Sequence, residues 1–265
     1  MKSITSLFSE RFAKKQKIAL VTCYDYTFAR LLNDSEADCL LVGDSLGMVI
    51  QGNDSTLPVT LDDMIYHCRA VRRGAPDKMV ICDMPFLSYQ VSVESALVNA
   101  GRILAEGNCH AVKIEGHTEH NLAVIRKLSE NGIPVMGHIG LTPQSVHTLG
   151  GYRVQGKTED SGMQLVKAAT EMEKAGVFSL LLELIPAGLG EMISNTVGVP
   201  TIGIGAGNQT HGQVLVLYDL LGLNPGFHPR HLKKYAELGQ QTIQAINEYA
   251  REVGNGKFPS AENSF

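Results

Sequence analysis

The feature that most constrains the fold of this chain is a repeated alternation of short apolar segments with longer amphipathic ones. The apolar segments are hydrophobic at consecutive rather than alternate positions, which is typical of parallel strands that are covered on both faces. Eight such segments are spread along the chain, at residues 18–24, 39–42, 79–82, 111–114, 133–136, 179–182, 199–204 and, less distinctly, 214–217.

The segments between these apolar runs carry hydrophobic residues at helical spacing. In residues 61–71 they recur at i, i+3, i+4 and i+7, and Thr60 with Asp63 forms a candidate capping box at the start. Similar stripes run through 93–104, 122–128 and 165–172. About eight strands with intervening helices in ~250 residues predict a (β/α)8 TIM barrel. A doubly wound open sheet is the alternative, because periodicity does not distinguish a closed sheet from an open one.

We expect a single domain over residues 1–265, made of the barrel, an N-terminal lead segment and a C-terminal helix. No repeat beyond the strand–helix alternation and no low-complexity linker interrupts the sequence. From Tyr235 onward, Leu238, Ile246, Tyr249 and Val253 fall on one helical face. This amphipathic helix is expected to pack on the barrel or on a neighbouring subunit.

Composition narrows the class of protein. Lys plus Arg total 23 and Asp plus Glu total 27, a formal charge of −4 that gives no reason to expect nucleic acid or an anionic membrane as a partner. The longest apolar stretches are interrupted by Glu183 or Asp219, so no membrane span is predicted. The five cysteines lack paired spacing and are interpreted as buried small hydrophobes. Without a signal-peptide pattern at the N-terminus, a cytoplasmic protein is expected.

Charged or polar residues stand at the ends of five successive predicted strands. These residues are Asp44 and Ser45, Asp83, Lys113 and Glu115, His138, and Glu183. A charge buried in such apolar surroundings without a partner would cost several kcal/mol. In a barrel the strand ends converge on one mouth, where active sites of this fold lie. The pattern therefore predicts one polar site rather than unrelated loop charges.

The residue types in this group indicate a chemistry. Asp44, Asp83 and Glu115 offer carboxylate oxygens without soft ligands nearby, which favours a hard divalent ion such as Mg²⁺. Lys113 and His138 suit an anionic substrate whose enolate oxygen needs stabilisation. Glu183, between apolar neighbours, is a candidate general base for a carbon acid, with a structural salt bridge as the alternative.

Two other patterns receive less weight. Residues 43–47 match the G-x-S-x-G elbow of serine hydrolases, but the following residues 48–53 are expected to be an extended loop rather than the required helix. Residues 203–207 lack the G-x-G-x-x-G order of a dinucleotide site.

The long segment 140–160 after the fifth strand suggests a lid.

Seven segments in family order resemble ketopantoate hydroxymethyltransferase. They are 22–26 (TCYDY), 42–48 (VGDSLGM), 66–71 (YHCRAV), 83–86 (DMPF), 112–116 (VKIEG), 137–145 (GHIGLTPQS) and 203–207 (GIGAG). The resemblance covers nearly the whole chain. One position departs from it: His117 stands where the family more usually has a second glycine, which leaves Lys113 and Glu115 intact.

The resemblance implies a Mg²⁺-dependent TIM barrel of pantothenate biosynthesis. Such an enzyme transfers a hydroxymethyl group from 5,10-methylenetetrahydrofolate to 3-methyl-2-oxobutanoate through a Mg-bound enolate, giving 2-dehydropantoate. By the match, Asp44 and Asp83 ligate Mg²⁺ and Glu115 completes the site directly or through water. The α-keto acid chelates this ion. The family also implies a homodecamer.

The resemblance assigns the remaining candidate residues to the keto acid. Ser45 and Lys113 contact it, and Glu183 removes its C3 proton. His138 is placed behind them as a second donor or proton relay.

Two alternatives stay open. A related Mg²⁺-dependent C–C lyase or aldolase would form the same enolate from another α-keto acid, and dependence of turnover on tetrahydrofolate would separate the two. A barrel kept as a binding or assembly module would show no Mg²⁺-dependent turnover.

Overall fold

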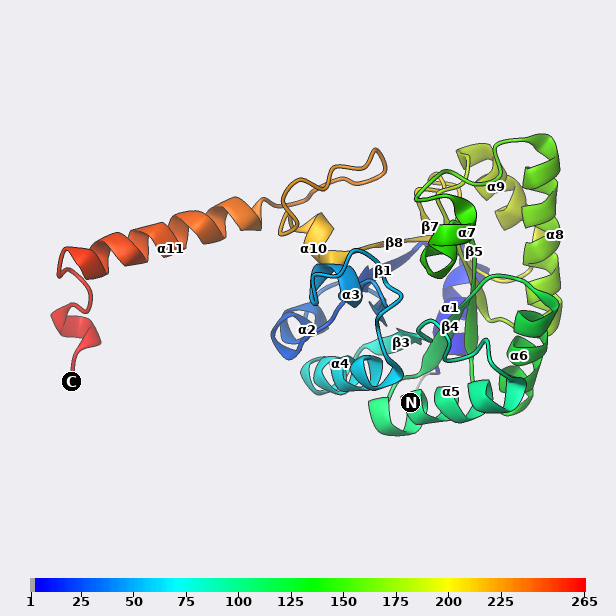
Figure 1. The fold of residues 1–265 in the computed structure, drawn as a ribbon, viewed down its shortest axis with the longest axis horizontal. Helices are drawn as coiled ribbons and strands as arrows, with labels where there is room; N and C mark the ends of the chain where they lie inside the picture. Colours follow the sequence, from blue (N-terminus) through cyan, green and yellow to red (C-terminus); the bar gives the residue numbers. More distant parts are fainter. Residues whose placement is uncertain (1–2) are drawn as a thin grey trace. The chain divides into compact units, whose positions relative to one another are not determined.

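The computed structural model describes residues 3–265, and the first of its two compact units, which ends at Leu215, is a closed barrel of eight parallel strands (Figure 1). Each strand pairs with the next along the chain, and the eighth pairs with the first. The strands are β1 (Ile18–Thr22), β2 (Cys39–Val42), β3 (Met79–Asp83), β4 (Ala111–Glu115), β5 (Val135–Gly140), β6 (Ser179–Glu183), β7 (Thr201–Ile204) and β8 (Gly212–Leu215). The predicted TIM barrel is confirmed, and the open-sheet alternative is wrong.

Helices follow the strands and cover the outside of the barrel (Figure 1). The longer ones are α2 (Tyr26–Asn33), α4 (Leu61–Gly74), α5 (Val93–Gly107), α6 (Glu119–Glu130), α8 (Glu159–Ala175) and α9 (Ala187–Thr196). The predicted capping box of α4 is confirmed: the Thr60 side chain accepts from the Asp63 backbone N–H, and the Asp63 side chain accepts from the Thr60 backbone N–H. Each cap fixes where a helix begins, and hence the length of the loop before it.

The interior of the barrel is apolar at its amino-terminal end. Ile81, Ala111, Met136 and other inward side chains form one core cluster, which also includes Ile4 and Phe8 of α1 (Ile4–Ala13). Helix α1 therefore closes this end of the barrel. The carboxyl ends of the strands are left for polar side chains.

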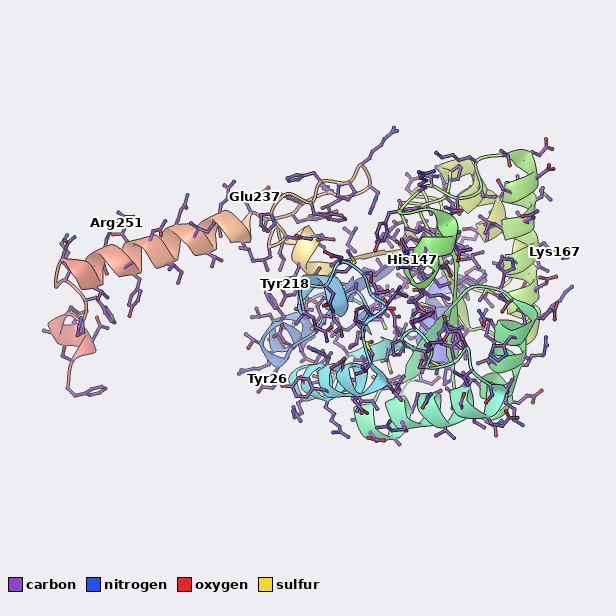
Figure 2. The ribbon with its side chains drawn as sticks, in the orientation of Figure 1. Tyr26, His147, Lys167, Tyr218, Glu237 and Arg251 are labelled. Atoms are coloured by element: carbon purple, nitrogen blue, oxygen red, sulfur yellow. The ribbon has the colours of Figure 1, made fainter. Side chains whose placement is uncertain are left out.

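The second compact unit, Val216–Phe265, contains α10 (Leu217–Leu220), α11 (Leu238–Gly254) and the short η2 (Ala261–Asn263). Helix α11 forms where the sequence predicts it, and none of its residues is buried. Its side chains, Arg251 among them, stand out along its whole length (Figure 2). The expectation of one domain over residues 1–265 stays a prediction. Among residues 3–265, no helix has both the length and the apolar character needed to cross a bilayer.

Candidate active site

The strand register places the polar residues of the barrel mouth side by side. Asp83 of β3 is paired with Lys113 of β4, and Glu115 of β4 is paired with His138 of β5. Register partners on neighbouring strands point to the same face of the sheet, and so do residues i and i+2. These four side chains therefore form one contiguous group. Glu183 ends β6, in register with Gly140 of β5.

Four of these strands extend further than the sequence predicts: β3 to Asp83, β4 to Glu115, β5 to Gly140 and β6 to Glu183. Glu115 is the last residue of β4, and His138 lies inside β5, whereas the apolar runs end one or two residues earlier. The charged side chains can stay in the buried strands because each finds a polar partner there, which offsets the cost of removing it from water.

Lys113 is the centre of the group. Its Nζ lies 3.3 Å from Asp83 Oδ1, 3.2 Å from Glu115 Oε1 and 3.1 Å from His138 Nδ1, and all four residues are buried. Burial alone would lower the pKa of Lys113, but the carboxylates of Asp83 and Glu115 raise it well above its usual range. Lys113 is therefore a permanent cation at the mouth.

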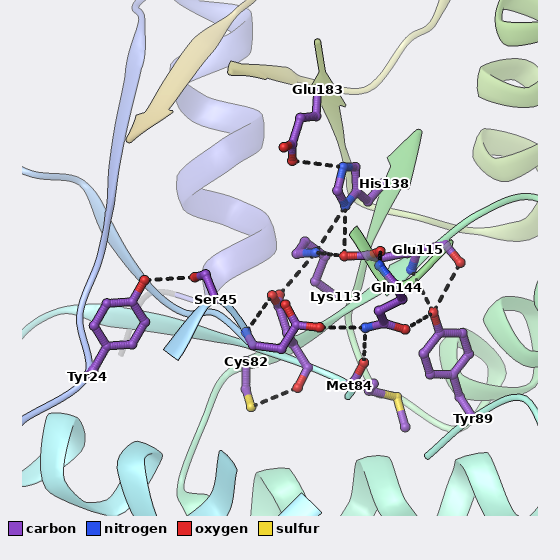
Figure 3. A network of polar contacts seen from close by, with 12 residues as sticks. Tyr24, Ser45, Cys82, Met84, Tyr89, Lys113, Glu115, His138, Gln144 and Glu183 are labelled. Carbon is purple, nitrogen blue, oxygen red and sulfur yellow. Dashed lines mark hydrogen bonds and ion pairs between the residues drawn. The ribbon is translucent and has the colours of Figure 1, made fainter. Parts of the chain in front are cut away.

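His138 lies between two carboxylates (Figure 3). Its Nδ1 is 3.3 Å from Glu115 Oε1, and its Nε2 is 3.3 Å from Glu183 Oε2. Burial and Lys113 lower the pKa of His138, but its contacts with Glu115 and Glu183 outweigh them and raise it above the ordinary value. The Glu183 side chain is 20% exposed, against 3% for Glu115, so Glu183 is the carboxylate of this pair that faces the open mouth.

Asp44 follows β2 and lies against Asp83. Its backbone N–H donates to Asp83 Oδ2 at 3.1 Å. Burial and the charges of Glu115 and Asp83 raise the pKa of Asp44 well above its usual range. Burial also raises the pKa of Asp83, more than Lys113 lowers it. The two aspartates thus hold negative charge that the described side chains do not fully compensate.

Gln144 links the site residues and was missed by the sequence analysis. It lies in the 3-10 turn η1 (Pro143–Ser145) after β5, and its Nε2 donates to Asp44 Oδ2 at 2.8 Å and to the Met84 carbonyl at 2.9 Å. Its backbone N–H donates to Glu115 Oε2 at 3.1 Å. The signal available in the sequence was its place in the 137–145 segment, within the predicted lid.

Tyr89 joins this network through its hydroxyl, which bonds both Gln144 and Glu115. Its hydroxyl donates to Gln144 Oε1 at 2.8 Å and accepts from the backbone N–H of Glu115 at 3.3 Å (Figure 3). Tyr89 is 1% exposed, and nothing in the sequence distinguishes it from a core aromatic residue.

Ser45 lies at the edge of the group, with its Oγ 2.8 Å from the hydroxyl of Tyr24. The expected extended loop over residues 48–53 is wrong at its start, because the short helix α3 (Leu46–Val49) begins directly after Ser45, whereas residues 50–53 are not helical. A single helical turn needs no apolar periodicity, so the hydrophobic pattern does not predict it. The described side-chain partner of Ser45 is a tyrosine rather than a histidine, so a hydrolase triad still has no support.

Asp44 and Asp83 fit a hard divalent cation. Asp83 Oδ1 is buried and makes no hydrogen bond within the described residues, although Lys113 is near. A Cβ at Gly43 would lie 3.4 Å from Asp83 Oδ2 and 2.8 Å from Ser45 Oγ, so glycine keeps this space open. Oxygen donors with uncompensated negative charge are what Mg²⁺ prefers, and it usually takes one or two carboxylates.

Glu115 is engaged differently. One of its oxygens contacts Lys113 and His138, and the other accepts from the Gln144 backbone N–H. Burial would raise the pKa of Glu115, but Lys113, His138 and the Gln144 hydrogen bond lower it to about 2. The predicted trio of Asp44, Asp83 and Glu115 is not gathered into one ligand set. In the described part of the chain, the three candidate ligands within 4.8 Å of one another are cysteines.

Comparison with known proteins shows the family of this chain. The model of the family described as ketopantoate hydroxymethyltransferase matches residues 2–261. A protein of Leptospira interrogans named 3-methyl-2-oxobutanoate hydroxymethyltransferase is 57% identical over 265 residues, covering 100% of both chains. Proteins of the same name from Heliobacterium modesticaldum and Thermotoga maritima are 54% and 53% identical, each over 95% of this chain and 92% of the relative.

Solved structures support the fold alone. Phosphonopyruvate hydrolase in complex with oxalate and Mg²⁺ aligns with a TM-score of 0.65 at 10% identity, over 99% of this chain and 93% of that one. A 2,3-dimethylmalate lyase of the PEP mutase/isocitrate lyase superfamily aligns with a TM-score of 0.62 at 15% identity, over 100% and 92%.

Proposed function

Because this chain belongs to the ketopantoate hydroxymethyltransferase family, an enzyme family of pantothenate biosynthesis, we propose that it transfers a hydroxymethyl group from 5,10-methylenetetrahydrofolate to 3-methyl-2-oxobutanoate. The product is 2-dehydropantoate. The proposed reaction rests on 57% identity, over the full length, to a relative named 3-methyl-2-oxobutanoate hydroxymethyltransferase. The geometry of the barrel mouth supports the proposed residue roles.

The proposed metal is Mg²⁺, held by Asp44 and Asp83. Their raised pKa values support this assignment, as does Asp83 Oδ1, which has an ion-pair contact with Lys113 but no hydrogen bond within the described residues. When bound, Mg²⁺ supplies positive charge that polarises the keto group of the substrate. Glu115 acts on the ion through water in this proposal, since both of its oxygens already have protein partners.

The keto acid is bound and oriented by the residues around the cation. Lys113 offers a permanent positive charge to the substrate carboxylate or to the developing enolate oxygen. The hydroxyl of Ser45, positioned by Tyr24, is a second donor at the edge of the group. Asp44 and Asp83 contribute to this pocket as the ligands that fix where the substrate lies.

Glu183 is proposed as the general base. Its carboxylate is the most open of the acidic side chains of the mouth that have been described, and it takes the C3 proton of 3-methyl-2-oxobutanoate. The electron pair left at C3 delocalises into the enolate and then forms the new bond to the one-carbon unit of the folate. That carbon is bonded to two folate nitrogens, and both bonds break: one as the carbon–carbon bond forms and the other as one water molecule provides the hydroxyl oxygen. The C3 proton and one proton of this water end on the two nitrogens, which gives tetrahydrofolate. His138, whose Nε2 lies 3.3 Å from Glu183, relays the proton in this proposal.

The first step can be tested by itself. With 3-methyl-2-oxobutanoate in deuterated water, the enzyme and Mg²⁺ should replace the C3 hydrogen with deuterium in the absence of folate, followed by proton NMR. Absence of exchange with and without Mg²⁺ would overturn the proposal. A related C–C lyase or aldolase would exchange the proton as well, but it would give no hydroxymethyl product when 5,10-methylenetetrahydrofolate is added.

The protein is further proposed to be a cytoplasmic homo-oligomer, a decamer by its resemblance to the family. All five cysteines are free, as is usual in a reducing compartment. On helix α11, Ile243, Ile246 and Tyr249 are each more than half exposed, which favours cover by a second copy of the chain. Sedimentation velocity of the full chain tests the oligomeric state.

A further inference from the structure

Three cysteine side chains meet outside the barrel wall, between β3 and the helices that cover it. Cys68 lies on α4, Cys82 on β3 and Cys109 two residues after the end of α5, and all three are buried. Their sulfur atoms all lie within 4.8 Å of one another. These thiols come from a helix, a strand and a loop, so their meeting is a property of the tertiary fold rather than of local sequence.

The barrel wall separates this cluster from the mouth. Cys82 directly precedes Asp83, and successive residues of a strand point to opposite faces. Figure 3 shows the sulfur of Cys82 on the side of the strand away from Lys113 and Glu115. The thiols are therefore not part of the carboxylate group described above.

We propose that Cys68, Cys82 and Cys109 form a binding site for one thiophilic divalent cation of the zinc class. Thiolate sulfur selects such ions over Mg²⁺. With a metal–sulfur distance of about 2.3 Å, three sulfurs arranged in a plane around an ion would be about 4 Å apart. The observed spacing of up to 4.8 Å needs only a small contraction to reach this geometry.

A positive side chain acts electrostatically on the cluster. Three thiolates around a divalent ion leave one negative charge, and the charge of Arg72 acts on Cys109. The guanidinium is fixed by hydrogen bonds from Nη1 to the carbonyls of Ala75 at 3.0 Å and Lys78 at 2.8 Å. Its Nε is buried and has no hydrogen-bond partner in the described residues. The loaded site with Arg72 would be neutral, as a buried site requires.

Gly107 makes the close approach of these elements possible. A Cβ there would lie 3.1 Å from the Cβ of Cys68 and 3.8 Å from the sulfur atoms of both Cys68 and Cys109. Asn108 then takes a left-handed conformation, with φ of 56°, which turns the chain toward Cys109. Binding would take one proton from each thiol and form three metal–sulfur bonds without any change of oxidation state.

Cadmium titration of the reduced full-length protein tests this site. Cd²⁺ is the probe, and Mg²⁺ is kept saturating so that the carboxylates at the mouth are occupied. Because the thiols are buried, incubation continues until binding is complete. We expect one Cd²⁺ per chain, ultraviolet thiolate-to-cadmium absorption, a ¹¹³Cd NMR shift in the sulfur-ligand range and a raised melting temperature.

Single cysteine variants provide the control. Cys109→Ser should weaken Cd²⁺ binding by more than about 100-fold, because loss of a direct ligand costs more than the 10–100-fold of an outer-shell partner. Cys23→Ser, which removes a buried thiol outside the cluster, should bind as the wild type does. A ¹¹³Cd shift in the oxygen-ligand range, Cd²⁺ displaced by Mg²⁺, or equal loss in both variants would overturn the proposal. The wild-type shift decides the matter even if Cys109→Ser does not fold.

Discussion

His138 Nε2 lies 3.3 Å from Glu183 Oε2, and this contact joins the most open carboxylate of the site to its buried interior. The other ring nitrogen of His138 lies 3.3 Å from Glu115 Oε1. Nε2 is buried and makes no hydrogen bond of good geometry within the described residues, so Glu183 is placed near the ring without being committed to it. A carboxylate held in this way keeps oxygen atoms available for a proton from a bound carbon acid.

Replacement of Glu183 tests its role as the base. Glu183→Gln keeps the size of the side chain but removes its ability to accept a proton. The C3 hydrogen–deuterium exchange rate of 3-methyl-2-oxobutanoate, measured by proton NMR, should fall by about 100-fold or more. Mg²⁺ binding should stay within a few-fold of the wild type.

An exposed glutamate provides the matched control. Glu191 lies on the outside of α9, and Glu191→Gln should leave exchange unchanged. If Glu183→Gln exchanges deuterium as fast as the control does, Glu183 is not the base.

Gln144 should act as a positioning residue for the metal ligands. Gln144→Ala removes the donor to Asp44 Oδ2 and the acceptor for the Tyr89 hydroxyl. We expect Mg²⁺ affinity, measured by calorimetry, to fall by roughly 10–100-fold, the usual effect of losing an outer-shell partner. Saturating Mg²⁺ should restore most of kcat, since the base is untouched.

Gln90 offers the comparison for this variant. Its Nε2 also contacts Gln144 Oε1, at 3.2 Å, but Gln90 has no described contact with Asp44. Gln90→Ala should therefore change Mg²⁺ affinity little. A Gln144→Ala variant that binds Mg²⁺ like the wild type would show that Asp44 needs no such support.

The strands and the acidic residues at their ends could be predicted because both depend on local sequence. A parallel strand buried on two faces is apolar at consecutive positions, so Asp83 and Glu115 stand out against it. Gln144 could not be found in this way. It is 100 residues from Asp44 along the chain, and a glutamine in a polar loop becomes a link only when the loop folds back over the mouth.

The thiol cluster and the helical turn after Ser45 could not be predicted from the sequence, for related reasons. The five cysteines were correctly interpreted as buried, but spacing along the chain does not reveal that Cys68, Cys82 and Cys109 converge from a helix, a strand and a loop. Helix α3 has four residues, too few to show a hydrophobic period. Tertiary contacts decide both features.

Asp44 should reduce the stability of the metal-free protein. The pKa of Asp44 is raised in the folded state, so the folded protein binds the Asp44 proton more tightly than the unfolded chain does. The stability that comes from this proton is complete below the usual pKa of 3.8 and is lost as pH rises through the raised folded pKa. At pH 7, Asp44→Asn removes this charge and keeps an oxygen to accept from Gln144. We expect calorimetry to show a higher melting temperature than the wild type without Mg²⁺.

Adding Mg²⁺ should reverse the order of the two proteins. The wild type gains stability from binding the ion, whereas Asp44→Asn should gain little. Asp54→Asn, at an exposed loop aspartate, should match the wild type under both conditions. Equal stabilisation of Asp44→Asn and the wild type by Mg²⁺ would remove Asp44 from the ligand set.

Gly140 should be required for the position of Glu183. It has φ of +97°, and a Cβ there would overlap the backbone carbonyl oxygen of Glu183 and lie 2.9 Å from the side chain of Ile185. Gly132 also has a positive φ, +78°, but a Cβ there would meet nothing within 4 Å. Gly132→Ala should therefore cost only the strain of about 1–2 kcal/mol for a left-handed residue. Gly140→Ala should cost more in chemical denaturation and, at a temperature where it is folded, should also slow C3 exchange, because the base is displaced. If the two variants lose equal stability and Gly140→Ala exchanges normally, the contact between β5 and the end of β6 does not set the position of the base.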